Sequence, residues 1–152
     1  MNNRNLTSHL LIAIFAIFVG AQLVEGCLMV PHWKSMSSSE FYSFYGSFGP
    51  GIGQFYTILT VIAGLITIGI AIQQWLNKSN GRYWALAAAI LMIICIGMFY
   101  VYFKGANELF YAGELSPDAL RAELDIWLTW HNVRVVMELL ALGFLCVAVS
   151  KD

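Results

Sequence analysis

Charged residues are scarce in this sequence of 152 residues, and their scarcity excludes most classes of soluble protein. Only 11% of the residues are charged, whereas 59% are hydrophobic and the mean hydropathy is +0.71. A soluble domain is usually about 25% charged. The net charge of −1 offers no basic surface to a nucleic acid. The composition therefore predicts a membrane-embedded chain whose partner is the lipid bilayer, with no nucleic acid as a partner.

Recognisable cofactor motifs are also absent from the sequence. There is no phosphate-binding glycine loop, no dinucleotide fingerprint, no Cys-x-x-Cys pair and no His-Glu-x-x-His run. The three cysteines, Cys27, Cys95 and Cys146, fall in different apolar runs at different depths, so they predict no disulfide framework. No cofactor is required by the sequence, and any site must be argued from isolated polar residues.

Four long apolar runs dominate what is present. A helix needs about 17–25 residues to cross a bilayer, and backbone groups in lipid must pair within the chain. We therefore predict an all-α fold, an integral membrane four-helix bundle that forms a single domain over residues 1–152. The predicted helices cover about 9–31, 52–76, 82–105 and 117–150.

Two helix starts have clear capping patterns. Ser116 is a favourable N-cap and Pro117 a favourable first residue, and nothing interrupts the helix that follows, so the last helix is predicted to be long and extended. Ser37-x-x-Glu40 is a capping box that predicts a short interfacial helix in the first outer loop.

The distribution of basic residues predicts the orientation. With four spans, both termini and the loop at 77–82 lie on one side, and that side contains Arg4, Lys78, Arg82 and Lys151. Basic residues favour the cytoplasmic side. We therefore expect a multi-pass protein of the bacterial inner membrane with both termini in the cytoplasm.

Polar residues recur on one face of the first predicted helix and on one face of the last. Gln22, Glu25 and His32 are spaced by three and seven residues, and His131, Arg134 and Glu138 by three and four. Glu25 lies about 9 Å below Pro31 and Glu138 about 10 Å below His131 at 1.5 Å per residue. Two carboxyl groups on separate helices are thus predicted at the same depth.

Such residues are costly in lipid, at about 2.5–3.5 kcal/mol each on insertion scales. Glu25 and Glu138 are therefore expected to face the interior of the bundle, where Arg134 can form a forked contact with a carboxylate. Asn107, just beyond the third run, is positioned to join them. These residues predict a polar pocket between helices one and four.

The residues leave the chemistry of this pocket open. His131 could act as a base while Arg134 and Asn107 hold the resulting anion. Alternatively, a metal ion could bind the candidate ligands His131, His32, Glu25 and Glu138, or a single histidine could bind haem. A further alternative is a non-catalytic binding or accessory subunit in which the same residues form a structural network between helices.

Several segments resemble the anthrone oxygenase-like family of small four-helix membrane proteins, most of which have no known function. These segments are "GAQLVEGCLMVPHW", "FGPGIGQFYTILTVIAGL", Asn107, and "W-x-x-W-H-N-V-R", which begins at Trp127 and includes Trp130. Fungal relatives are associated with the oxidation of polycyclic anthrones to anthraquinones. The resemblance implies that Asn107, His131, Asn132 and Arg134 line the pocket, whereas Glu25 and Glu138 rest on the depth argument alone.

The leading hypothesis is a membrane-embedded oxidoreductase, an oxygenase, that acts on an apolar aromatic or quinone-like molecule. The substrate would enter from the outer leaflet between helices one and four, and a homo-oligomer is compatible with the sequence. Catalytic roles are assigned to His131, Arg134 and Asn107. Supporting binding roles are assigned to Gln22, Glu25, His32, Trp130, Asn132 and Glu138.

Overall fold

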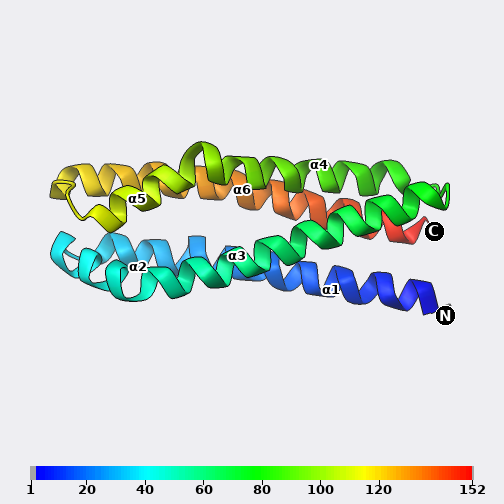
Figure 1. Cartoon of the computed structure of the whole chain (residues 1–152), viewed down its shortest axis with the longest axis horizontal. Coiled ribbons are helices and arrows are strands. Elements are labelled where there is room, and N and C mark those ends of the chain that lie inside the picture. Colours follow the sequence, from blue (N-terminus) through cyan, green and yellow to red (C-terminus); the bar gives the residue numbers. More distant parts are fainter. Residues whose placement is uncertain (1–2, 152) are drawn as a thin grey trace.

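Four long helices run side by side in the computed structural model, which describes residues 3–151 and places side chains from Leu6 onward (Figure 1). The first helix consists of α1 (Asn3–Val24), a π-helical segment η1 (Glu25–Met29) and α2 (Val30–Ser35). The second is α3 (Ser38–Leu76), and the fourth is α6 (Pro117–Ser150). The third consists of α4 (Arg82–Met98), the π-helical segment η2 (Phe99–Phe103) and α5 (Lys104–Ala112). The predicted all-α four-helix bundle is confirmed, including its long last helix.

All four helices are long and apolar enough to cross a membrane. Their spans are 30, 39, 31 and 34 residues, and each has a mean hydropathy above 2 in its most apolar window. By length and composition the chain is therefore an integral membrane protein. Residues 1, 2 and 152, which the predicted single domain includes, lie outside the described part.

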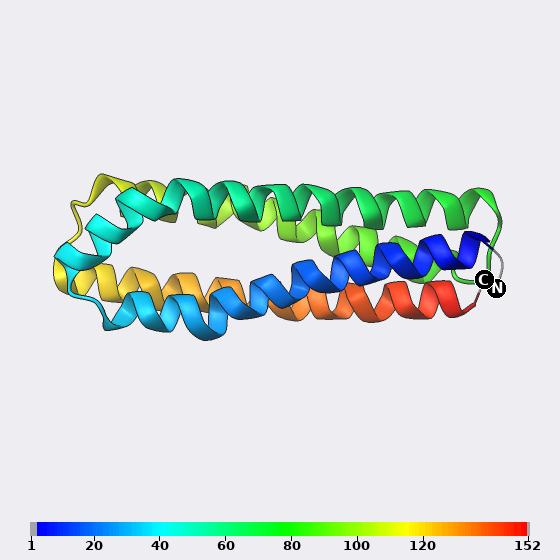
Figure 2. The ribbon, with the colours of Figure 1, turned by 90° about the horizontal axis from the view of Figure 1, so that it is seen from below.

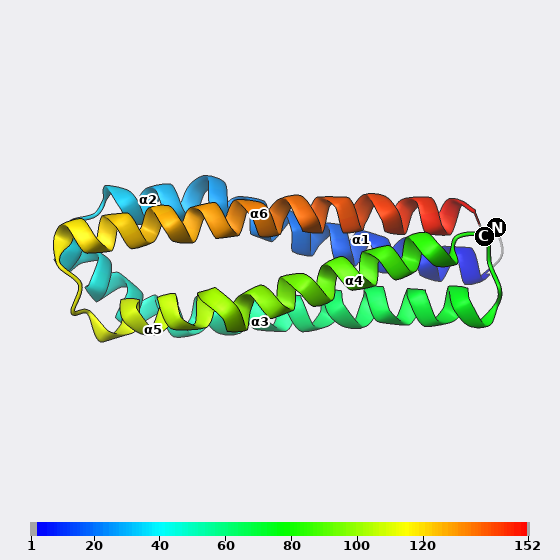
Figure 3. The ribbon, with the colours of Figure 1, turned by 90° about the horizontal axis from the view of Figure 1, so that it is seen from above.

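The two described ends of the chain lie at the same end of the bundle, next to the connection at 77–81 (Figures 1, 2 and 3). At this end Gly81 lies against the backbone of α6, where an added Cβ would be only 2.1 Å from the Ala148 carbonyl oxygen. Only glycine allows this close approach. Lys78, Arg82 and Lys151 belong to this end, whereas the Arg4 side chain lies outside the described residues.

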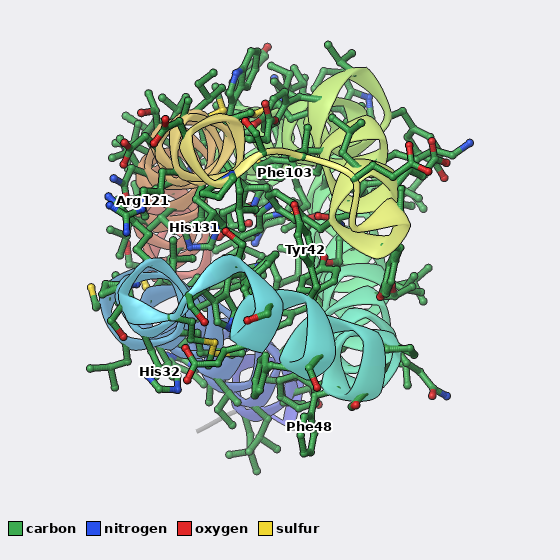
Figure 4. All side chains as sticks on the ribbon, turned by 90° about the vertical axis from the view of Figure 1, so that its left-hand side faces the viewer. His32, Tyr42, Phe48, Phe103, Arg121 and His131 are labelled. Atoms are coloured by element: carbon green, nitrogen blue, oxygen red, sulfur yellow. The ribbon has the colours of Figure 1, made fainter. Side chains whose placement is uncertain are left out.

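The connection between the first two long helices is shorter than the sequence predicted, because its expected interfacial helix is the beginning of α3. Ser37 and Glu40 form the expected capping box, and the helix then continues without a break to Leu76 through Pro50. A proline within a helix removes one backbone hydrogen bond and bends the helix. The early part of α3 accordingly crosses the end of the bundle before the helix turns along it (Figures 2 and 4).

The two π-helical segments change which face of their helices points inward. A π-helical turn holds about one residue more than an α-helical turn, so it rotates the following residues by about 100°. Buried positions in the first long helix accordingly step by five residues, from Glu25 to Val30. The third long helix has the same step from Met98 to Phe103.

The apolar core has two parts, separated along the bundle by a polar layer. Near the termini, small and aliphatic side chains such as Ala85, Ala88 and Leu145 pack with Phe15 and Phe18. The core at the opposite end is aromatic. It includes Trp33, Phe41, Tyr45, Phe103, Phe110 and Trp127. The polar residues of the first helix and of α6 lie between these two cores in sequence, and they form the candidate site.

Candidate functional site

Arg134 is the centre of a polar cluster that joins the first long helix to α6. Its Nη2 donates to Gln22 Oε1 at 2.9 Å and to Glu25 Oε2 at 3.3 Å. Its Nε lies 3.9 Å from Glu138 Oε1. Gln22, Glu25 and Glu138 each expose 4% of their surface or less. One guanidinium thus lies between two buried carboxyl groups that come from different helices.

His131 is completely buried in this cluster, and both of its ring nitrogens have a partner. Nε2 lies 2.9 Å from the Gln22 carbonyl oxygen, and Nδ1 lies 2.9 Å from Arg134 Nη2. A carbonyl oxygen only accepts and a guanidinium only donates. Nε2 therefore bears the proton, and the lone pair of Nδ1 accepts from Arg134. The imidazole is neutral in this arrangement and links the backbone of one helix to the arginine of another.

The local structure of the first helix makes room for this contact. The Ala21 and Gln22 carbonyl groups, which lie in the last turn of α1 before η1, accept side-chain hydrogen bonds from Tyr56 (3.0 Å) and His131. One turn further on, Gly26 faces the imidazole. A Cβ at this position would lie 2.8 Å from His131 Cδ2 and 2.9 Å from Nε2, far inside ordinary contact distance. Gly26 is therefore required for the close approach of the two helices.

A cavity of about 210 Å³ lies beside the polar cluster. For comparison, an engineered apolar cavity of about 150 Å³ binds benzene. Glu25, Arg134 and Glu138 form its polar wall, and Asn107 also borders it. Most of the other lining residues are apolar or aromatic, and they come from all four long helices. They include Trp33, Tyr45, Tyr56, Met92, Phe103, Tyr111 and Trp127.

Three buried polar atoms of residues that line this cavity have no hydrogen-bond partner among the described residues. They are Trp33 Nε1, Arg134 Nε and Glu138 Oε2. A buried polar group without a partner costs about 1–3 kcal/mol, and native proteins contain few of them. Two donors and one carboxyl oxygen of the lining residues therefore lack a partner within the described part of the chain.

Aromatic contacts connect the polar cluster to the aromatic core at the end opposite the termini. The Trp127 and His131 rings are stacked, with centroids 5.1 Å apart, and Trp127 Nε1 donates to Asn107 Oδ1 at 3.2 Å. The Arg134 guanidinium carbon lies 4.5 Å from the centroid of the Phe103 ring. Asn107 thus reaches the site through Trp127 and makes no direct hydrogen bond with the arginine among those of the described residues.

Three predicted site residues lie elsewhere. His32 is exposed on the outside of the bundle, whereas His131 lies inside it (Figure 4). The prediction for His32 assumed an uninterrupted α-helix, and the extra residue in η1 turns His32 outward and Trp33 inward. Asn132 is exposed on α6, although its Oδ1 lies near Gly26. Trp130 is 36% exposed and stacks on Tyr102, away from the cavity lining.

The pocket is also placed differently from the prediction. The sequence predicted a pocket between helices one and four, but these two helices supply only part of the lining, and α3 and the third long helix supply the rest. Trp33, Trp127 and Tyr56 are lining residues that sequence reasoning missed. Their spacing from the polar residues was informative only for Trp127, which lies four residues before His131 on the same helix face.

The donor groups do not fit the predicted metal or haem site. Among residues 6–151, no group of three or more His, Cys, Asp or Glu side chains is placed to hold a metal ion. Both nitrogens of His131 are engaged by Gln22 and Arg134, and His32 lies outside the cavity. No described histidine of the cluster therefore has a free nitrogen for a metal or a haem iron.

Comparison with known proteins identifies a family for this chain. A family model described as anthrone oxygenase matches residues 47–146, which are 100 of the 152 residues. The matched range includes Asn107, His131, Arg134 and Glu138, whereas Gln22 and Glu25 precede it. No curated protein and no solved structure matches the chain.

Proposed function

The chain belongs to the anthrone oxygenase family, and from this premise we propose that it is a membrane-embedded oxygenase whose substrate is a flat aromatic molecule bound in the cavity. The observation on which the proposal depends is the set of unpartnered polar atoms, Trp33 Nε1, Arg134 Nε and Glu138 Oε2, in residues that line an otherwise largely apolar cavity. An aromatic ketone or phenol complements this combination, because its rings suit the apolar walls and its oxygen accepts from the donors.

The reaction proposed is the conversion of a methylene group between two aryl rings into a carbonyl group, with O₂ as oxidant and water as the second product. Such a methylene group is acidic because its anion is delocalised into the neighbouring ketone. A base takes one proton, the carbanion reduces and binds O₂, and the peroxide anion takes the proton back. The base then takes the second C–H proton, which breaks the O–O bond, leaves the carbonyl group and releases hydroxide. The hydroxide takes this proton from the base to form water.

Glu138 is the group we assign as base. Its Oε2 has no partner, its side chain is 1% exposed, and its other oxygen lies 3.9 Å from Arg134. General bases of this kind contribute typically about 10²–10⁴-fold to a rate. The assignment replaces His131, because the lone pair of its Nδ1 is already bonded to Arg134.

Arg134 and Trp33 are assigned to the developing anion. Delocalisation places the negative charge of the carbanion on the ketone oxygen, and preorganised donors in a water-poor site stabilise such a charge strongly. Arg134 is held by Gln22 Oε1, Glu25 Oε2 and His131 Nδ1, all through Nη2, so Nε is left for the substrate. We also propose that the termini face the cytoplasm, since Lys78, Arg82 and Lys151 belong to that end.

Substitution of Glu138 tests the proposal. The purified protein in lipid nanodiscs is given a hydroxyanthrone, and O₂ uptake is followed together with the absorbance of the anthraquinone product. Glu138→Gln keeps the shape of the side chain and removes the base, so turnover is expected to fall about 10²-fold or more. Glu108→Gln makes the same chemical change at an exposed position of α5 and is the matched control.

Two results would contradict the proposal in different ways. Unchanged turnover in Glu138→Gln would refute the role of this carboxyl group. A folded wild-type protein that neither binds nor oxidises any anthrone would instead favour the second candidate, a non-catalytic subunit. The observation in favour of that candidate is the network that ties Gln22 and Glu25 to Arg134, because the same contacts hold two helices together.

A further inference from the structure

The cavity opens on the side of α3 and the third long helix: its exposed lining residues all belong to these two helices, and all but Tyr111, on α5, lie on α3 or η2. On α3, the lining residues Gly53 and Thr57 are exposed, and Val61 is 54% exposed. On η2, the lining residues Phe99 and Tyr100 are 38% and 70% exposed. The polar wall lies on the other two long helices, and its carboxyl groups are buried.

This opening lies near the middle of the helices. Thr57 is the central residue of α3, which runs from Ser38 to Leu76, and η2 begins just past the midpoint of the helix that runs from Arg82 to Ala112. At 1.5 Å per residue, Thr57 is about 28 Å from each end of α3. In a helix that crosses a bilayer, such a position lies in the hydrocarbon region. The surrounding residues agree, since Ile58 and Val101 expose 51% and 78% of their surface.

Packed cores lie towards both ends of the bundle, and a second pocket at the end opposite the termini shares only the buried Trp33 with the cavity lining. Towards the termini, the aliphatic core packs between the four helices from Phe15 to Leu145. Towards the other end, buried aromatic residues fill the bundle, and the early part of α3 crosses over it (Figure 4). A molecule that came from water at either end would therefore have to displace a packed core.

The π-helical segment η2 explains why the gap lies at this point. A π-helical turn is wider than an α-helical turn and rotates the residues after it. The wide turn between α4 and α5 is visible in Figure 1. Before it, Met92 and Cys95 are buried, and its last residue Phe103 and the following Ala106 are buried as well. Phe99 and Tyr100, within it, remain exposed, so this helix does not close against α3 there.

From these observations we propose that the ligand enters sideways from the hydrocarbon of the bilayer, through an opening bordered by Gly53 and Thr57 on α3 and by Phe99 and Tyr100 on η2. The inference rests on the proposed function for the kind of ligand, a planar aromatic molecule that dissolves in lipid. Such a molecule is concentrated in the membrane and meets the opening without crossing water. The predicted route between helices one and four is replaced, because the Gln22, His131 and Arg134 contacts close that side.

Filling the opening tests this route. An added Cβ at Gly53 meets nothing within 4 Å, so Gly53→Leu is tolerated sterically and narrows the opening. Gly69→Leu is the matched control, because Gly69 is exposed on the same helix, does not line the cavity and also has nothing within 4 Å of an added Cβ. If Gly53→Leu fails to fold, Thr57→Phe is used in its place, with Ile58→Phe as its control.

The probe is 1-hydroxyanthraquinone, a product-like molecule that quenches tryptophan fluorescence. Trp33 and Trp127 line the cavity and report its arrival. Vesicles that contain the protein are mixed with vesicles that contain the probe, and association and dissociation are followed by stopped flow. We expect Gly53→Leu to slow both rates by the same factor of about ten, with Kd changed less than twofold, because a narrowed entrance affects both directions equally. Gly69→Leu should match the wild type.

Equal association rates in the two variants would overturn the inference. So would an altered Kd at an unchanged association rate, since that result would place Gly53 in the binding wall only. A wild-type protein that binds the probe with these kinetics but never oxidises an anthrone would refute the proposed function and retain the lateral route. A wild type that does not bind the probe would contradict both.

Discussion

Replacing Gly26 by alanine is expected to separate the two helices that form the polar wall. The new Cβ would lie 2.8 and 2.9 Å from two atoms of the His131 ring, where ordinary contacts are 3.4–4 Å. The ring must then move by about half an ångström or more, and its 2.9 Å hydrogen bond to the Gln22 carbonyl oxygen lengthens. Overpacking of this kind costs about 1–3 kcal/mol, and weakening a buried hydrogen bond adds about 1 kcal/mol or more.

Helix propensity acts in the opposite direction. Alanine favours a helix interior by about 1 kcal/mol over glycine. The net destabilisation expected for Gly26→Ala is therefore about 1–3 kcal/mol, measured as the free energy of unfolding in mixed detergent micelles. Gly20→Ala is the control on the same helix, because an added Cβ there meets nothing within 4 Å. That variant should be stabilised by up to about 1 kcal/mol.

The test depends on whether the free energy of unfolding falls in Gly26→Ala and rises in Gly20→Ala. Equal stabilisation of both would show that His131 does not lie against Gly26, and the geometry of the polar wall would then be wrong. A double-mutant cycle strengthens the test. In a His131→Ala background the ring is gone, so Gly26→Ala should lose its cost and behave as Gly20→Ala does.

Two further predictions concern stability. Arg134→Gln removes the only guanidinium that contacts Glu25 and Glu138 among the described residues, so the free energy of unfolding should fall by about 3–5 kcal/mol. A decrease in the free energy of unfolding of less than about 1 kcal/mol in the same micelle assay would contradict this role. Ser116→Ala removes the hydroxyl that accepts from the Ala119 backbone N–H at the start of α6, which should cost about 1 kcal/mol, whereas Ser150→Ala at the other end of α6 should cost less.

The fold could be predicted from the sequence because long apolar runs in lipid leave few alternatives to helices. The start of α6 was also predictable, since Ser116 and Pro117 form a local pattern that depends on no distant contact. The continuity of α3 through Pro50 was not predictable. A proline next to several glycines is typical of a break, and only the packing of the surrounding helices maintains a single bent helix there.

The candidate site was predictable in part, for a geometric reason. Glu25 and Glu138 were expected at one depth, and the structure places Arg134 between them. This inference needed only the rise per residue, which a π-helical turn changes little. Which face His32 occupies depends on the rotation per residue, and one extra residue in η1 was enough to turn it outward.

The cavity itself could not be predicted from the sequence. Its lining residues come from positions as far apart as Glu25 and Glu138, and no local pattern relates Trp33 to Tyr56 or to Phe103. Whether His131 acts as a base or as a link between helices could not be predicted from the sequence either. A buried histidine near an arginine suits a base or a link between helices equally well, and the partners of its two nitrogens decide between them.

The most direct test of the account is an experimental structure of the protein in lipid with 1-hydroxyanthraquinone bound. The account predicts that the rings occupy the cavity between α3, η2 and the polar wall, with a ligand carbonyl oxygen within hydrogen-bond distance of Arg134 Nε and with the rings in contact with Glu138. A ligand bound elsewhere, or an Arg134 side chain directed away from Glu25 and Glu138, would contradict it.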